Sequence, residues 1–146
     1  MKQGWLWYWL WFLIWQECKN YGNDHWRRFQ GKAKLAKNTY PEISWKSGKE
    51  LTEEELFQAE GVLGFHGYIK KELEQGREVT SLAKKLIEKN PKVILVSDEV
   101  GYGVVPMDAS ERAFREAVGR VCTELAGFSS RVTRVVCGIG TVIKDA

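Results

Sequence analysis

Two carboxylates follow a buried strand in the last third of the chain. Residues 93–96 are four apolar β-forming residues in a row, which is typical of a strand buried on both faces of a sheet. Asp98 and Glu99 come directly after it, in a turn that also contains Gly101 and Gly103. Open α/β sheets bind their ligands at the carboxyl ends of the strands. This turn is therefore the best functional position that the residue pattern supplies.

A second candidate for chemistry is Gly31-Lys32, at the start of a segment of helix-compatible composition that Pro41 ends. A glycine followed by a lysine completes the phosphate-binding loop G-x-x-x-x-G-K, in which backbone N–H groups and the lysine bind phosphates. The upstream glycine is absent from the chain as written. Ala33 stands where such a loop has Ser or Thr to ligate magnesium.

The elements that position these residues follow from capping and periodicity. Helices are predicted to begin at Thr52, in a capping box with Glu55, and at Asp108, in a box with Glu111. Apolar residues at helical or strand spacing predict the other helices and strands. The predicted segments are helices from 52 to about 61 or 64, over 65–73, 79–89 and 108–127, strands over 93–96 and 132–137, and a polar turn over 44–49. Strand, helix and strand alternate, so the fold class is α/β.

Length and composition limit the function. A chain of 146 residues is one domain's worth. Residues 1–49 hold nine Lys/Arg and three Asp/Glu, whereas residues 50–146 hold thirteen and sixteen. The basic residues are scattered and not clustered, so we expect no nucleic-acid partner. Three cysteines without a C-x-x-C pair support neither a disulfide framework nor a zinc site, and a reducing cytoplasm fits best.

The N-terminal segment does not fit this pattern. Residues 5–15, WLWYWLWFLIW, are eleven apolar residues, too few for a membrane span, which needs roughly 20. No cleavage site follows them, and an interfacial anchor remains an alternative. We favour another interpretation, in which residues 1–28 are an aberrant segment outside the fold, read out of frame. Shifted by one base, the codons of residues 23–28 permit Met-Ile-Ile-Gly-Gly-Ala, which would join Phe29 to give G-G-A-F-Q-G-K.

The second half resembles a known family. LVSDEVGYGVVP (residues 95–106), ERAFREAVGRVCTELA (111–126) and RVVCGIGTVIK (134–144) look like the signature of the adenosylcobinamide kinase/guanylyltransferase family. In that family a strand ends in N-E-V-G, followed by G-x-V-P and R-x-F-R-D on the next helix. The resemblance implies a P-loop NTPase-like domain over residues 29–146, with a mostly parallel sheet flanked by helices and incomplete at the N-terminus.

The resemblance also implies an activity. Members phosphorylate the aminopropanol arm of adenosylcobinamide with ATP or GTP and then transfer GMP to it, in cobalamin biosynthesis. Gly31 and Lys32 would bind the nucleotide, with Lys32 acting on the transferred phosphate. Asp98 and Glu99 take the place of the Asn-Glu pair and would hold Mg²⁺ or orient the substrate hydroxyl. A homo-oligomer is compatible with the sequence.

Other assignments are weaker. Arg112 and Arg115 match the helix arginines and would neutralise phosphate charge, or they pair with neighbouring glutamates. The histidine among arginines that becomes guanylylated in larger members has no match, because the neighbours of His66 are not basic. We expect His66 to be a packed helix residue, and leave the covalent nucleophile unassigned. The alternatives are a catalytically impaired nucleotide-binding homologue and a membrane-peripheral or RNA-binding protein that uses the Trp-rich front.

Overall fold

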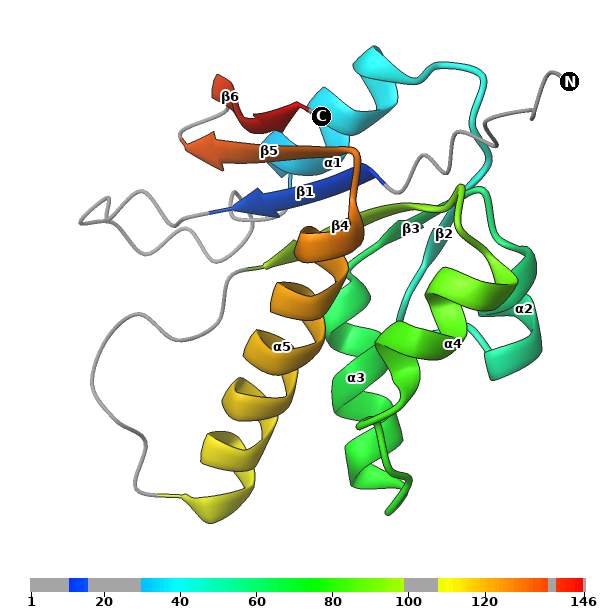
Figure 1. The fold of residues 1–146 in the computed structure, drawn as a ribbon, viewed down its shortest axis with the longest axis vertical. Coiled ribbons are helices and arrows are strands. Elements are labelled where there is room, and N and C mark those ends of the chain that lie inside the picture. Colours follow the sequence, from blue (N-terminus) through cyan, green and yellow to red (C-terminus); the bar gives the residue numbers. More distant parts are fainter. Residues whose placement is uncertain (1–10, 16–29, 99–107, 137–138, 146) are drawn as a thin grey trace, which may run out of the picture.

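The computed structural model describes residues 11–15, 30–98, 108–136 and 139–145, and for residues 11–15 it describes the backbone alone. Six strands form one sheet in the order β2-β3-β4-β1-β5-β6. All neighbouring strands are parallel except β6, which is antiparallel to β5. Figure 1 shows β1, β4 and β5 pointing the same way. The strands are β1 Trp11–Trp15, β2 Trp45–Ser47, β3 Gly61–Leu63, β4 Ile94–Asp98, β5 Arg131–Val136 and β6 Ile139–Asp145.

Helices cover both faces of the sheet. The helix α1 lies on one face, and α3, α4 and α5 lie on the other (Figure 1). The helices are α1 Gln30–Thr39, α2 Glu53–Gln58, α3 Phe65–Glu74, α4 Leu82–Lys89 and α5 Ala109–Phe128. A mostly parallel sheet flanked by helices confirms the α/β class expected from the alternation of strands and helices.

The strand β1 corrects one expectation. Residues 1–28 were expected to lie outside the fold, yet Trp11–Trp15 forms a strand between β4 and β5, with Leu13 in register with Val96 and Thr133. A strand between two parallel neighbours and under helices on both faces is apolar throughout. WFLIW satisfies that requirement, since it is a run of aromatic and branched residues.

The core has two parts because side chains alternate across the sheet. The larger cluster lies between the sheet and α2–α5 and contains Leu95 of β4. A smaller cluster lies under α1 and contains Ala36, Val96 and Val135. Asp98 is two residues beyond Val96 and therefore lies on the α1 face of the same strand. The strand thus aims this carboxylate toward the start of α1.

The helix starts agree with the sequence, and two short strands do not. Thr52 caps α2 in a capping box with Glu55, as predicted. Asp108 caps α5 as predicted, but its carboxylate accepts from the Ser110 N–H and the predicted box with Glu111 does not form. The segment 44–49, predicted as a turn, contains β2, and the end of the helix predicted from 52 to about 61 or 64 is β3. Strands of three residues are too short to show an alternating pattern. They form here because Trp45 and Val62 pack on opposite faces of the sheet.

Candidate active site

The ammonium group of Lys32 forms an ion pair with the carboxylate of Asp98. Lys32 lies in the first turn of α1 and Asp98 at the end of β4. The Lys32 side chain is 4% exposed and that of Asp98 28% exposed. A buried ammonium is costly without a partner, so Asp98 stabilises the charged lysine, while its own partial exposure leaves a carboxylate face open to a ligand.

His66 is the third member of the cluster. Its Nδ1 accepts a hydrogen bond of 3.0 Å from the backbone N–H of Asp98, and its Nε2 lies 3.4 Å from Asp98 Oδ2. Because Nδ1 accepts, the neutral ring carries its proton on Nε2, facing the carboxylate. Burial, followed by the charges of Lys32, Lys49 and Lys70, lowers the pKa of His66 to about 4. The imidazole is therefore neutral at pH 7.

These three residues line a cavity of about 340 Å³ at the carboxyl edge of the sheet. The strands β2, β3 and β4 and the helix α1 all contribute to its wall. Its lining is Lys32, Ala33, Ser47, Lys49, Leu63, Gly64, His66, Val96 and Asp98. A polar cluster at one side of a partly apolar cavity is the usual form of a small-molecule site.

The structure brings together some of the residues predicted from the sequence. Lys32, Asp98 and His66 meet, and Gly31 is in the same turn of α1 as Lys32. Glu99 lies outside the described residues. It therefore stays a prediction from the sequence.

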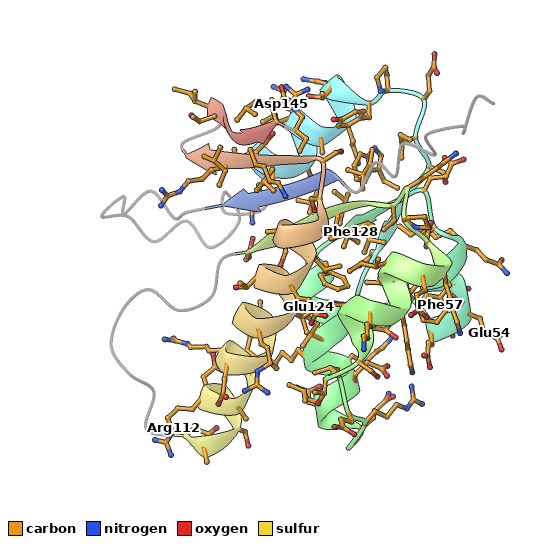
Figure 2. The ribbon with its side chains drawn as sticks, viewed as in Figure 1. Glu54, Phe57, Arg112, Glu124, Phe128 and Asp145 are labelled. Carbon is orange, nitrogen blue, oxygen red and sulfur yellow. The ribbon has the colours of Figure 1, made fainter. Side chains whose placement is uncertain are left out.

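The two arginines are placed elsewhere. Arg112 and Arg115 are in the first two turns of α5, and neither lines the cavity. Figure 2 shows Arg112 at the opposite end of α5 from Phe128. The Nε of Arg115 lies 3.7 Å from Glu111 Oε1, one turn away on the same helix. This ion pair is the structural alternative to phosphate binding for Arg115.

Sequence reasoning missed Ser47, Lys49 and Gly64, because it took their short strands for a turn and a helix. Gly64 has φ 70°, a left-handed conformation that favours glycine. It turns the chain from β3 into α3 and so places His66 in the first turn of that helix. The signal in the sequence was an apolar pair, Val62-Leu63, followed at once by glycine.

The described residues include no ready-made metal cluster. They contain no group of three or more His, Cys, Asp or Glu that could hold a metal ion by itself. Mg²⁺ in phosphoryl-transfer sites takes one or two carboxylates together with substrate phosphates and waters, and the partly exposed Asp98 fits that role. Within the same residues, no helix is long and apolar enough to cross a membrane.

A mostly parallel sheet with helices on both faces, and with a lysine–aspartate pair beside a cavity at its carboxyl edge, defines an α/β protein with a candidate site where such folds bind ligands. The sequence model of the family "Cobinamide kinase / cobinamide phosphate guanyltransferase" matches residues 25–143. The chain belongs to this family, which confirms the resemblance found in the sequence.

Two curated relatives are similar to parts of the chain. Both are named bifunctional adenosylcobalamin biosynthesis protein CobU. The protein of Escherichia coli K12 is 43% identical over 67 residues, which are 46% of this chain and 37% of the relative. The protein of Salmonella typhimurium LT2 is 49% identical over 53 residues, 36% of this chain and 29% of the relative. The matched part thus spans about a third of each relative.

Proposed function

We propose that this protein phosphorylates adenosylcobinamide with ATP or GTP, in a P-loop-like site centred on Lys32 and Asp98. The Lys32–Asp98 ion pair beside the cavity supports this most directly. Phosphoryl transfer consists mainly of positioning and charge neutralisation. A buried lysine at the start of a helix and a carboxylate at the end of the neighbouring strand supply both. Family membership supports a cobinamide acceptor.

In this mechanism the nucleotide phosphates approach the first turn of α1, where backbone N–H groups and the positive end of the helix dipole attract anions. The Lys32 ammonium is then shared between Asp98 and the phosphate being transferred. A Mg²⁺ ion bound with the nucleotide supplies further charge neutralisation, and Asp98 is the described residue that would hold it.

The acceptor oxygen forms a bond to the γ-phosphorus as the bond from that phosphorus to the β–γ bridging oxygen breaks. The nucleoside diphosphate leaves, and the hydroxyl proton of the acceptor passes to the Asp98 carboxylate and then to solvent. His66 holds the backbone of Asp98 through Nδ1. It therefore acts as a positioning residue.

GMP transfer to the phosphorylated acceptor is the second step of the proposal: an oxygen of the acceptor phosphate bonds to the α-phosphorus of GTP as the α–β bond to pyrophosphate breaks. We assign no covalent intermediate to His66. Its Nδ1 lone pair accepts the Asp98 N–H, and the side chain is only 12% exposed. A nucleophilic imidazole needs a nitrogen lone pair that can reach the phosphorus.

The decisive experiment incubates the purified full chain with adenosylcobinamide, Mg²⁺ and either ATP or GTP, and follows the corrinoid by mass spectrometry. We expect the mass of one added phosphoryl group, and with GTP a further GMP. The variant Lys32→Met should lose the product, whereas Lys34→Met, an exposed lysine of the same helix, should retain it. An unchanged corrinoid with wild-type protein would reject the proposal.

One observation favours a second candidate function, a homologue that binds nucleotide without turnover. Ala33 lines the cavity next to Lys32, at the position where a phosphate loop carries a hydroxyl for magnesium. Calorimetry separates the two functions. Saturable nucleotide binding without phosphorylated corrinoid would support the impaired homologue. Restoration of turnover by Ala33→Ser would show that the missing hydroxyl is the cause.

A further inference from the structure

A second lysine, Lys49, lines the same cavity. Lys49 follows β2 through Gly48, and that connection is fixed against the end of β3. The Gly48 N–H donates to the carbonyl of Leu63 at 2.8 Å, and a Cβ on Gly48 would lie 2.4 Å from the carbonyl oxygen of Gly64. The backbone before Lys49 therefore has one tight position, which only glycine permits.

The stem of Lys49 is fixed by a second close approach. A Cβ on Gly67 of α3 would lie 2.8 Å from Lys49 Cγ. The helix therefore leaves room, at Gly67, for the aliphatic part of this lysine. The ammonium charge of Lys49 contributes to the lowered pKa of His66, so its field reaches the lysine–aspartate cluster. The side chain itself is exposed to solvent.

The charges around the cavity do not balance. Among its described lining residues, Lys32 and Lys49 are cations, Asp98 is the one carboxylate and His66 is neutral. Lys32 pairs with Asp98. Within the described part of the chain, Lys49 has no ion pair or hydrogen bond. Among the described lining residues, one positive charge is thus not balanced by a carboxylate, which favours an anion.

The start of helix α3 also favours an anion in the cavity. Its N-cap, Gly64, lines the cavity and supplies no side-chain cap. The first turn of this ten-residue helix therefore presents partial positive charge on the same side as Lys49. In the sheet, β2, which precedes Lys49, lies beyond β3 from β4, the strand that carries Asp98.

We propose that Lys49 binds the phosphate monoester of the phosphorylated acceptor, after that phosphate has left Lys32. This inference rests on the proposed function. The donor phosphates belong at α1 and Lys32, so a dianion that moves to the acceptor needs a second cation that lines the same cavity. Lys49 and the start of α3 supply it, and the same site would present the phosphate for guanylyl transfer.

The test compares Lys49→Met, which keeps the stem on Gly67 but removes the charge, with Lys49→Arg, which keeps the charge. Lys46→Met is the matched control, since Lys46 is an exposed lysine of β2 that does not line the cavity. Calorimetry measures the binding of three probes to each full-length variant. The probes are aminopropanol phosphate, adenosylcobinamide phosphate and ATP.

We expect Lys49→Met to weaken both phosphate monoesters about 10- to 100-fold, as expected for the loss of one charge-assisted hydrogen bond, and to change ATP affinity less than about threefold. Lys49→Arg should keep most of the monoester affinity, and Lys46→Met should resemble wild type. In turnover, Lys49→Met should relieve inhibition by the phosphorylated product.

Several results would overturn the inference. They are wild-type protein that binds neither monoester, a Lys49→Met variant with unchanged monoester affinity, an equal effect of Lys46→Met, and a larger loss for ATP than for the monoesters. The last would assign Lys49 to the donor nucleotide. Wild-type protein that binds monoesters through Lys49 but transfers no phosphoryl group would reject the proposed kinase activity and keep the anion site.

Discussion

The backbone N–H of Asp98 donates to Nδ1 of His66 across 3.0 Å, and this bond ties the end of β4 to the first turn of α3. The bond exists only while Nδ1 is unprotonated. Burial and the surrounding lysines keep it so, because they lower the pKa of His66 to about 4 from 6.5. The position of the candidate catalytic carboxylate therefore depends on a neutral histidine.

The stability of the protein should consequently depend on pH in a defined window. The unfolded chain takes up a proton on His66 below about pH 6.5, whereas the folded chain does so only near pH 4. The free energy of unfolding should therefore fall as the pH drops from about 6.5 to 4, by about 3 kcal/mol from this residue. Urea unfolding at several pH values measures it.

The comparison for that measurement is His66→Asn, whose amide oxygen can accept the Asp98 N–H at every pH. The difference between wild type and this variant isolates His66 from the other titrating groups. Parallel curves for the two proteins between pH 6.5 and 4 would contradict the prediction.

Removing one partner of the Lys32–Asp98 ion pair should destabilise the protein more than replacing both partners. Asp98→Asn leaves the buried ammonium without its carboxylate. Breaking a fully buried pair costs about 3–5 kcal/mol, and the cost here should be smaller because Asp98 is 28% exposed. The double variant Lys32→Met/Asp98→Asn should recover most of that stability, since methionine fills the lysine's space without a charge. Denaturant unfolding of the three proteins measures the effect.

Activity should not recover together with stability. Both the single and the double variant should lose phosphoryl transfer, so a stable but inactive double variant is the expected outcome. A surface pair supplies the control. Lys85 and Glu53 are 3.0 Å apart and about half exposed, and Lys85→Met should change stability by less than about 1 kcal/mol. An unstable double variant would show that the pair itself stabilises the fold.

Asn90 should be important for stability, although it lies away from the cavity. Its side-chain amide donates to the carbonyls of Leu56 and Ala59, at 3.0 and 2.9 Å, at the end of α2. The Leu56 carbonyl also accepts a longer bond, of 3.4 Å, from the Ala59 N–H, and carbonyls at the end of a helix need partners outside it. Replacing Asn90 with Ala should cost about 1–3 kcal/mol, measured by thermal or urea unfolding. Asn38→Ala, an exposed asparagine on α1, should change stability little.

The sequence predicted the elements that carry long or capped patterns. The helix starts at Thr52 and Asp108 and the buried strand before Asp98 were all visible, because capping boxes and apolar runs are local signals. The strands β2 and β3 could not be predicted, because three residues are too few to show an alternating apolar pattern. The cluster around Lys32 and Asp98 could be expected from the rule that ligands bind at the strand ends.

The part of the site that could not be predicted depends on contacts distant in sequence. Lys49 reaches the cavity because Gly48 and Gly67 leave space for it. Neither glycine lies in a recognisable sequence motif. The contact of His66 with Asp98 joins residues 32 positions apart. Such pairings follow from the strand order, which a single sequence does not reveal when the intervening strands are short.

The last prediction concerns residues 1–28. We propose that Met-Ile-Ile-Gly-Gly-Ala in place of this segment would restore a complete phosphate loop, with Met-Ile-Ile as the strand now formed by residues 11–15 and G-G-A-F-Q-G-K leading into α1. Glycine backbone N–H groups could then surround the phosphates. ATP or GTP should bind this variant at least about tenfold more tightly than the chain as written, equivalent to one added charge-assisted hydrogen bond.

The matched control carries Met-Ile-Ile-Ala-Ala-Ala, which keeps the apolar strand but removes the glycines. Tight nucleotide binding by the glycine variant alone, together with an extra base found on sequencing codons 23–30, would establish the out-of-frame interpretation. Equal affinities for the two variants would mean that the nucleotide does not use this loop. The Lys32–Asp98 pair would then bind phosphate without a glycine cradle, and Trp11–Trp15 would remain the natural central strand.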